Sequence, residues 1–263
     1  TGLIIAGILL VVCTVALLSI IRDTGALDSP ETETSAAVKA TQPPETKPQT
    51  WSEQNSTTTI NIRAAGDLNI TDSVVKSGLT STGYDFTRSF MDVAPLLSEA
   101  DLTVLNLEGN IVGEPYGTER TSAPNDLLTA LRNAGVDLIQ MANSCAINNG
   151  LIGLKSTINA IHNSGMEPIG AYATQADFNR SKGYTICEAN GIKVAFVAFT
   201  KGMNGMGLPA GSEGRVNLLY TDYDSEYKKI DTEGITRILK NTAAEKPDIT
   251  IALLHWGSEG TDS

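Results

Sequence analysis

From about residue 57 onward, short apolar runs alternate with segments that have the periodicity of amphipathic helices. The predicted strands cover residues 60–67, 102–107, 136–141, 166–170, 184–189, 193–199 and 249–254. The predicted helices cover residues 87–99, 124–134, 151–163 and a segment that begins after Asp231. Alternation of this kind is typical of an α/β domain built around a largely parallel sheet.

Local signals add detail to this pattern. Asn190-Gly191 joins two predicted strands and is a strong hairpin signal, because both residue types adopt the left-handed turn conformation. Pro95 predicts a kink or a second helical start within residues 87–99. Residues 201–225 are rich in glycine and predict a long loop that could cover a site.

The N-terminal residues 3–21 form a continuous apolar run, interrupted only by Thr14 and Ser19. A helix needs roughly 20 apolar residues to cross a bilayer, whereas a buried core helix need not be apolar on every face. No small-residue cleavage pattern follows the run, which favours an uncleaved signal anchor over a cleaved signal peptide. We therefore expect residues 1–22 to cross the cell membrane once, with the acidic domain on the extracytoplasmic side.

Residues 23–56 are rich in Pro, Thr, Glu, Ser and Gln and contain almost no large apolar side chains. Such a segment cannot bury enough surface to offset the entropy of ordering, so we expect a disordered polar linker. The predicted α/β domain then covers residues 57–263. The chain starts at Thr1 rather than Met and stops shortly after a predicted core strand, so we expect a fragment whose domain is incomplete.

The formal net charge of −11 limits the kinds of partner that the chain can bind, and the spacing of its cysteines limits the kinds of metal site that it can form. Nucleic-acid binding requires clustered Lys and Arg, and the chain has no basic stripe, so we expect no nucleic-acid partner. The cysteines Cys13, Cys145 and Cys187 include no C-x-x-C pair, which argues against a thiolate zinc site. A Cys145–Cys187 disulfide would need an oxidising compartment and a geometry that the sequence does not define.

Four polar signatures follow the apolar runs: Gly66-Asp67, Asn106-Leu107-Glu108, Ala142-Asn143-Ser144-Cys145 and His255-Trp256-Gly257. In an open α/β sheet, ligands bind outside the carboxyl ends of the strands, so these groups can share one site, with Trp256 as a wall. Asp, Glu, Asn and His are also the side chains that a hydrolytic metal centre recruits. Their joint placement at strand ends favours one site over four unrelated turns.

Each signature taken alone also has a structural explanation. Asp67 and Asn143 could be turn formers that bond to nearby backbone. Glu108 could lie on a solvated strand edge, or it could be a ligand or base that Asn106 orients, since alternation sends both side chains to one face. His255 could be a satisfied core histidine or a ligand at a strand tip.

The signatures belong to a longer series of motifs in chain order. The series is Gly66-Asp67, Tyr84-Asp85-Phe86, Ala100-Asp101 with Asn106-Leu107-Glu108, Ala134-Gly135-Val136-Asp137 with Ala142-Asn143, and His255-Trp256-Gly257. It resembles the CapA family of capsule and poly-gamma-glutamate synthesis proteins over residues 61–259. The resemblance implies a metallophosphatase-like four-layer αββα sandwich, truncated at the C-terminus of this chain, with its site at the strand ends.

The resemblance also implies a function and a set of site residues. The function is extracytoplasmic, in making or exporting an anionic polymer, so the implied partners are the capsular polymer or its synthesis and export machinery. The implied cofactors are divalent metal ions. The implied metal ligands are Asp67, Glu108, Asn143 and His255, with Asn106 and Trp256 in supporting positions.

One motif departs from the family pattern. The family reads Ala-Asn-Asn-His followed by Asp and Gly, whereas this chain reads Ala142-Asn143-Ser144-Cys145 and then Asn148 and Gly150. Cys145 therefore stands where a hydrolase would have a proton-donating histidine, and a free thiol titrates near ~8.5. Three functions stay open: a metal-dependent hydrolase, an accessory protein that binds polymer or metal without turnover, and a Cys145 nucleophile with His255 as its base.

Overall fold

The computed structural model describes residues 57–257 of the 263-residue chain. These residues contain two β-sheets. The predicted anchor (residues 1–22) and linker (residues 23–56) lie outside the described residues. Within residues 57–257, no helix is both long enough and apolar enough to cross a membrane. The predicted α/β class with a largely parallel sheet is confirmed.

The first sheet is parallel throughout and has the order β1-β2-β3-β4. Its strands are β1 (Ile62–Asn69), β2 (Leu102–Glu108), β3 (Leu138–Gln140) and β4 (Glu167–Ile169). Every residue of β2 is buried, which suits an inner strand of a parallel sheet that is covered on both faces. β1 lies at the edge, and most of its residues are exposed.

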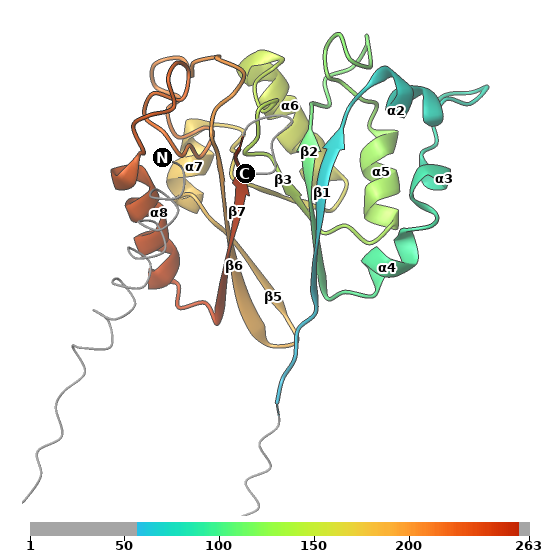
Figure 1. The fold of residues 1–263 in the computed structure, drawn as a ribbon. Coiled ribbons are helices and arrows are strands. Elements are labelled where there is room, and N and C mark those ends of the chain that lie inside the picture. The colour runs from blue at the N-terminus through green and yellow to red at the C-terminus, as the bar shows by residue number, and fades with distance from the viewer. Residues whose placement is uncertain (1–56, 258–263) are drawn as a thin grey trace, which may run out of the picture. The chain divides into compact units, whose positions relative to one another are not determined.

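The second sheet has the order β5-β6-β7, with strands β5 (Thr185–Ala189), β6 (Ile192–Thr200) and β7 (Ile249–His255). β5 and β6 form the predicted hairpin, and Asn190 and Gly191 both have positive φ angles, 53° and 75°. β6 and β7 are parallel, with Thr200 opposite His255. Figure 1 shows β1, β2 and β7 running in the same direction, so their carboxyl ends lie at one edge of the domain.

Helices lie outside the two sheets. They are α2 (Asp72–Ser77), α3 (Thr87–Phe90), α4 (Ala94–Ser98), α5 (Asp126–Asn133), α6 (Gly150–Asn163), α7 (Gln175–Ser181) and α8 (Thr232–Ala244). Figure 1 shows α3, α4 and α5 along the outer side of the first sheet and α8 along the outer side of the second.

The side chains of β6 show how these layers pack. Val194, Phe196 and Ala198 belong to the main core, together with buried residues of the first sheet, whereas Val197 and Phe199 form a separate cluster with Ile238 of α8. Successive residues of a strand point to opposite faces, so one face of β6 packs on the first sheet and the other on α8. Within residues 57–257 the layers therefore follow the order helix, sheet, sheet, helix.

Gly170 follows β4 and lies against Ala142 and against Ala198 of the second sheet. A Cβ atom on this residue would lie 2.7 Å from the Cβ of Ala142 and 2.8 Å from the Cβ of Ala198 in β6. The φ angle of Gly170 is also positive, at 81°. Glycine is required here both by backbone conformation and by space.

Two sequence predictions need correction. The first predicted strand does not end at Gly66-Asp67, because β1 continues to Asn69. Between Ala64 and Asp67 it advances three residues while β2 advances two, from Val104 to Asn106, which is a β-bulge. The predicted helix 87–99 is divided into α3 and α4, and Pro95 lies in the first turn of α4, where its missing N–H is not needed.

The helices α2 and α7 were not predicted, because each is too short to show an amphipathic period. Each nevertheless begins at a threonine that caps it. The Thr71 hydroxyl accepts a hydrogen bond from the amide of Val74, and the Thr174 hydroxyl accepts one from the amide of Asp177. A capping signal of this kind was therefore readable in the sequence.

We expect Gly170→Ala to lower the free energy of unfolding by about 2–4 kcal/mol, because the methyl group overpacks the contact between the sheets and φ is positive. Gly191→Ala is the matched control, since Gly191 also has a positive φ angle but has open space around its Cα. It should cost only about 1 kcal/mol in urea unfolding. Equal losses in the two variants would contradict the close approach of the sheets.

Candidate metal centre

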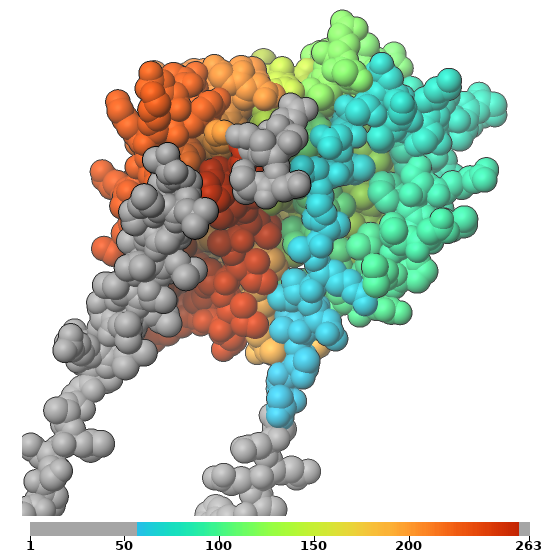
Figure 2. All heavy atoms as spheres, viewed as in Figure 1, coloured from blue at the N-terminus to red at the C-terminus, as the bar shows by residue number. Residues whose placement is uncertain are grey.

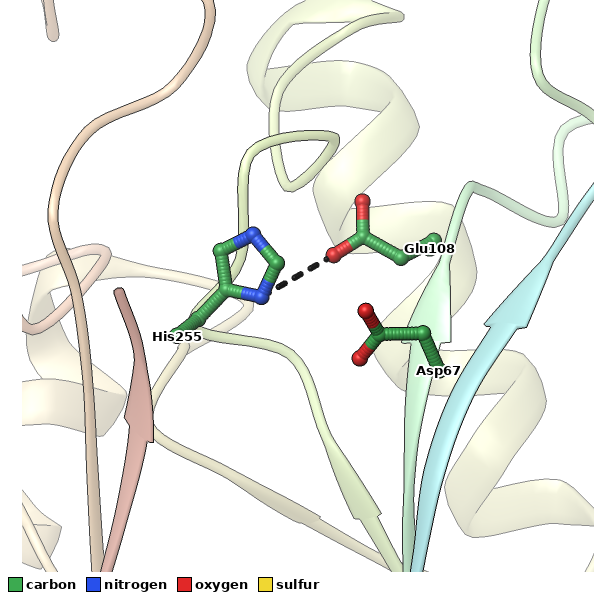
Figure 3. Close-up of side chains that lie close together, drawn as sticks. All are labelled: Asp67, Glu108 and His255. Carbon is green, nitrogen blue, oxygen red and sulfur yellow. Dashed lines mark ion pairs between the residues drawn. The ribbon is translucent and has the colours of Figure 1, made fainter. Parts of the chain in front are cut away.

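The carboxyl ends of β1, β2 and β7 bring three ionisable side chains together. The bulge in β1 places Asp67 opposite Asn106, and Glu108 follows Asn106 by two residues on the same face of β2. His255 is the last residue of β7, in the second sheet. Figure 3 shows the side chains of Asp67, Glu108 and His255 pointing toward one another.

One ligand atom from each of these three residues lies within 4.8 Å of the other two. His255 Nδ1 lies 3.2 Å from Glu108 Oε1. Glu108 is buried, with 6% of its side chain exposed, whereas the His255 side chain is 25% exposed and Asp67 is exposed. The cluster therefore has a buried side at Glu108 and an open side at Asp67.

Asn106 links the two carboxylates of the cluster. Its Nδ2 donates to Asp67 Oδ1 at 2.8 Å and to Glu108 Oε1 at 3.0 Å. Both protons of one amide group are thereby used to hold two negative charges side by side. This arrangement offsets part of the repulsion between the carboxylates and fixes the direction of both.

Asn143 lies behind Asn106 and is fully buried. Its Nδ2 donates to Asn106 Oδ1 at 2.9 Å and to the backbone oxygen of Leu107 at 2.8 Å. Its Oδ1 accepts a hydrogen bond from the amide of Cys145 at 3.0 Å. The Asn143 amide therefore orients Asn106, and metal binding by Asn143 itself stays a prediction.

Ser144 contacts the site directly, although the sequence indicated it only as a departure from the family pattern. Its hydroxyl donates to Glu108 Oε2 at 2.9 Å. Both oxygens of Glu108 are thus hydrogen-bonded, one by Ser144 and the other by Asn106. The only signal that could have identified Ser144 is its place beside Asn143 at the exit of a strand.

Cys145 carries a thiol that is buried and neutral. It is 8% exposed, and burial together with the nearby charge of Glu108 raises its pKa to about 11. A neutral thiol is a poor nucleophile, so this environment argues against a Cys145 nucleophile served by His255. Cys145 and Cys187 are both free, which excludes the disulfide considered from the sequence.

Two further predicted features surround the cluster. Trp256 directly follows His255 and is 59% exposed. The predicted glycine-rich loop, residues 201–225, has no helix or strand, and its Asn204 Nδ2 lies 3.4 Å from Asn148 Oδ1 in the loop after β3. Lys201 at its start donates its backbone amide to the oxygen of His255 at 2.9 Å, so the loop is tied to the end of β7.

The donor set suits a divalent cation. Two carboxylates and one imidazole offer oxygen and nitrogen ligands, which zinc, manganese and iron accept. The carboxylate Glu108 is buried and already oriented by hydrogen bonds, as expected for a metal ligand supported by its surroundings. The residues present therefore fit one divalent cation held by Asp67, Glu108 and His255.

Comparison with known proteins gives a family match. The family model described as bacterial capsule synthesis protein PGA_cap matches residues 61–263. Among solved structures, the calcineurin-like phosphoesterase YfkN from Bacillus subtilis is similar, with 20% identity and a TM-score of 0.41. That alignment covers 78% of this chain, which spans 64% of the YfkN chain. No curated protein matches the chain significantly.

We expect both described thiols to react slowly with iodoacetamide in the folded, chelator-treated protein. Burial raises the pKa of Cys187 as well to about 11, so at pH 8 the thiolate fraction is on the order of a hundredfold below that of an unfolded chain. Peptide mass spectrometry in buffer and in urea gives the rate at each cysteine. Alkylation of Cys145 at the same rate in both conditions would contradict the buried, neutral thiol.

Proposed function

Because the chain belongs to the bacterial capsule synthesis protein family over residues 61–263, we propose that its α/β domain holds a divalent cation and acts on an anionic polymer in capsule assembly. The family inferred from the ordered sequence motifs is thereby confirmed. The ligands are Asp67, Glu108 and His255. A bound cation would supply Lewis-acid chemistry at a phosphoryl or related oxyanion of the polymer.

The observation that carries this proposal is the convergence of the three side chains. They come from three strands and two sheets, yet their ligand atoms lie within 4.8 Å of one another. Asp67 and Glu108 repel each other without a cation, and the domain devotes the buried amides of Asn106 and Asn143 to holding this arrangement. Two adjacent carboxylates lower the stability of the fold, so stability does not explain this arrangement. A bound ligand of opposite charge does explain it.

A hydrolytic function is supported by the architecture. The layer order helix, sheet, sheet, helix and a site at the carboxyl ends of parallel strands are what a metallophosphatase-like sandwich requires. In this function Glu108 and Asp67 bind the cation, and Asn106 and Ser144 keep the Glu108 carboxylate in place.

A second function is favoured by Cys145. A thiol with a pKa of about 11 is a poor proton donor to a leaving group near neutral pH. The same crevice would then hold metal and polymer without turnover, as an accessory part of the synthesis or export machinery.

The proposal includes a location for the domain. The apolar run 3–21 supports a single membrane-spanning anchor, and the Pro-rich residues 23–56 support a spacer between the anchor and the domain. A tethered domain outside the cytoplasm would meet the polymer where it is assembled or exported.

We expect Mn²⁺ or Zn²⁺ to raise the melting temperature of the native protein and to have no such effect on Asp67→Asn. In chelator, Asp67→Asn should unfold with a free energy about 0.5–1 kcal/mol higher than that of the native protein at low salt, because one of two adjacent carboxylates is neutralised. Asp92→Asn is the control, since Asp92 is an exposed carboxylate between α3 and α4. Native protein that gains no stability from either ion would refute the metal centre.

Turnover separates the two functions. We expect the native protein with Mn²⁺ to hydrolyse a chromogenic phosphodiester slowly, and His255→Ala to abolish this activity. Cys145→His should raise the rate about 10²-fold, because a titratable proton donor then stands beside the site, whereas Cys145→Ala should not. Metal binding without native turnover, with activity appearing only in Cys145→His, would instead support the accessory function.

A further inference from the structure

An arginine lies exposed on the loop that follows the metal ligand Glu108. Residues 109–123 connect β2 to the start of α5, and they fold back on the strand end through two backbone hydrogen bonds. The amide of Asn110 donates to the oxygen of Thr121 at 2.8 Å, and the amide of Ala123 donates to the oxygen of Asn110 at 3.1 Å. Arg120 therefore belongs to the segment that is pinned two residues beyond Glu108.

The Arg120 side chain is held by a neighbouring amide. Its Nε donates to Asn149 Oδ1 at 3.0 Å, and Asn149 Nδ2 donates in return to the backbone oxygen of Arg120 at 2.7 Å. Asn149 also donates to Asn110 Oδ1 at 3.0 Å. These contacts fix the inner part of the guanidinium while its two terminal nitrogens have no hydrogen-bond partner among residues 57–257.

The charge of Arg120 is not balanced within the described part of the chain. No carboxylate oxygen of residues 57–257 lies within 4.0 Å of its guanidinium nitrogens, although the whole chain has a net charge of −11. Arg63, Arg132 and Arg180 each pair with a carboxylate, whereas Arg120 does not. Its terminal nitrogens are therefore available to an external anion.

The backbone beside Arg120 adopts a strained conformation. Thr121 has a φ angle of 47°, which is unusual for a β-branched residue. Its hydroxyl accepts a hydrogen bond from Asn148 Nδ2 at 2.8 Å, so the surrounding structure maintains this conformation. Strain that is held in place by neighbouring contacts is typical of ligand-binding loops.

The same short loop serves both the metal ligand and the arginine. Within residues 144–149, Ser144 donates to the metal ligand Glu108, Asn148 holds Thr121, and Asn149 holds Arg120. The metal cluster and the free guanidinium are thus anchored to opposite ends of one six-residue segment at the carboxyl edge of the sheet. A ligand bound at the cluster would lie next to Ser144, at one end of this segment.

We propose that Arg120 is the anion-binding residue of the site, where its terminal nitrogens receive a carboxylate or phosphate group of the polymer. This inference rests on the proposed metal centre and names the substrate class as an oxyanion-bearing chain. The terminal nitrogens of arginine form two parallel hydrogen bonds to either group, which a lysine ammonium cannot do. The metal cluster and Arg120 would then contact neighbouring anionic groups along the polymer.

The test measures anion binding and metal binding separately in the full 263-residue chain in mild detergent. The probes are a γ-linked glutamate oligomer and inorganic tripolyphosphate, which distinguish a carboxylate polymer from a phosphate polymer. We expect Arg120→Gln to weaken binding of the preferred probe about tenfold, and Arg120→Lys to restore only part of it. The affinity for Mn²⁺ should stay within about twofold of native in both variants.

Arg88→Gln is the matched control, because Arg88 is also exposed and has no carboxylate partner among residues 57–257, but lies on α3. It should leave the binding of both probes unchanged. Equal losses in Arg88→Gln and Arg120→Gln, native affinity in Arg120→Gln, or no binding of either probe to the native protein would each overturn the role of Arg120. Failure to bind Mn²⁺ would refute the metal centre, while loss of probe binding confined to Arg120→Gln would still support the anion site.

Discussion

One amide group, Nδ2 of Asn106, makes the candidate metal centre possible. It donates to a carboxylate on each side, Asp67 and Glu108, and its own oxygen accepts from the buried amide of Asn143. A carboxylate pair of this kind is unfavourable without donors, because like charges at short range repel and buried groups lose their hydration. The register of β1 against β2, set by the bulge before Asp67, is what brings Asp67 opposite that amide.

The third candidate ligand depends on a different interaction. His255 ends a strand of the second sheet, and no strand of that sheet pairs with a strand of the first. The position of its imidazole beside Glu108 is therefore set by how the sheets pack, with Phe196 and Ala198 on one side and the first sheet on the other. Figure 2 shows β1 and β7 reaching the surface on one face, so the ligands Asp67 and His255 come from the more exposed strands.

Local sequence patterns predicted what depends on local structure. Alternation identified the strands, Asn190-Gly191 identified the hairpin, and Asp231 caps α8 through the amide of Gly234. Strand ends also identified the residues that could form a site, because parallel strands deliver their carboxyl ends to one edge. Gly66 is a local signal for the bulge in β1, since a glycine inside a strand often marks one, but the pattern did not show that β1 continues beyond Asp67 to Asn69.

Contacts between distant segments could not be read from the sequence. The hydroxyl of Ser144 meets Glu108 across 36 positions, and Asn149 meets Arg120 across 29. Such contacts depend on how the loops fold back onto the ends of the strands. The hydrophobic periodicity of the sequence does not predict them. The role of Asn143 could not be predicted for the same reason. An asparagine at the end of a strand can form a turn, bind a metal or donate hydrogen bonds to other buried groups, and the local sequence is the same in each case.

The unequal exposure of the three donors has a kinetic consequence. Glu108 is enclosed, His255 is partly open and Asp67 faces solvent, so an ion would enter and leave along the Asp67 side. Exchange through an open side is fast compared with exchange from an enclosed cage. Since nitrogen and oxygen donors alone discriminate weakly among first-row divalent metals, the ion present would follow the supply in the surrounding medium. The domain would then respond to the metal available in its surroundings as much as to its own affinity.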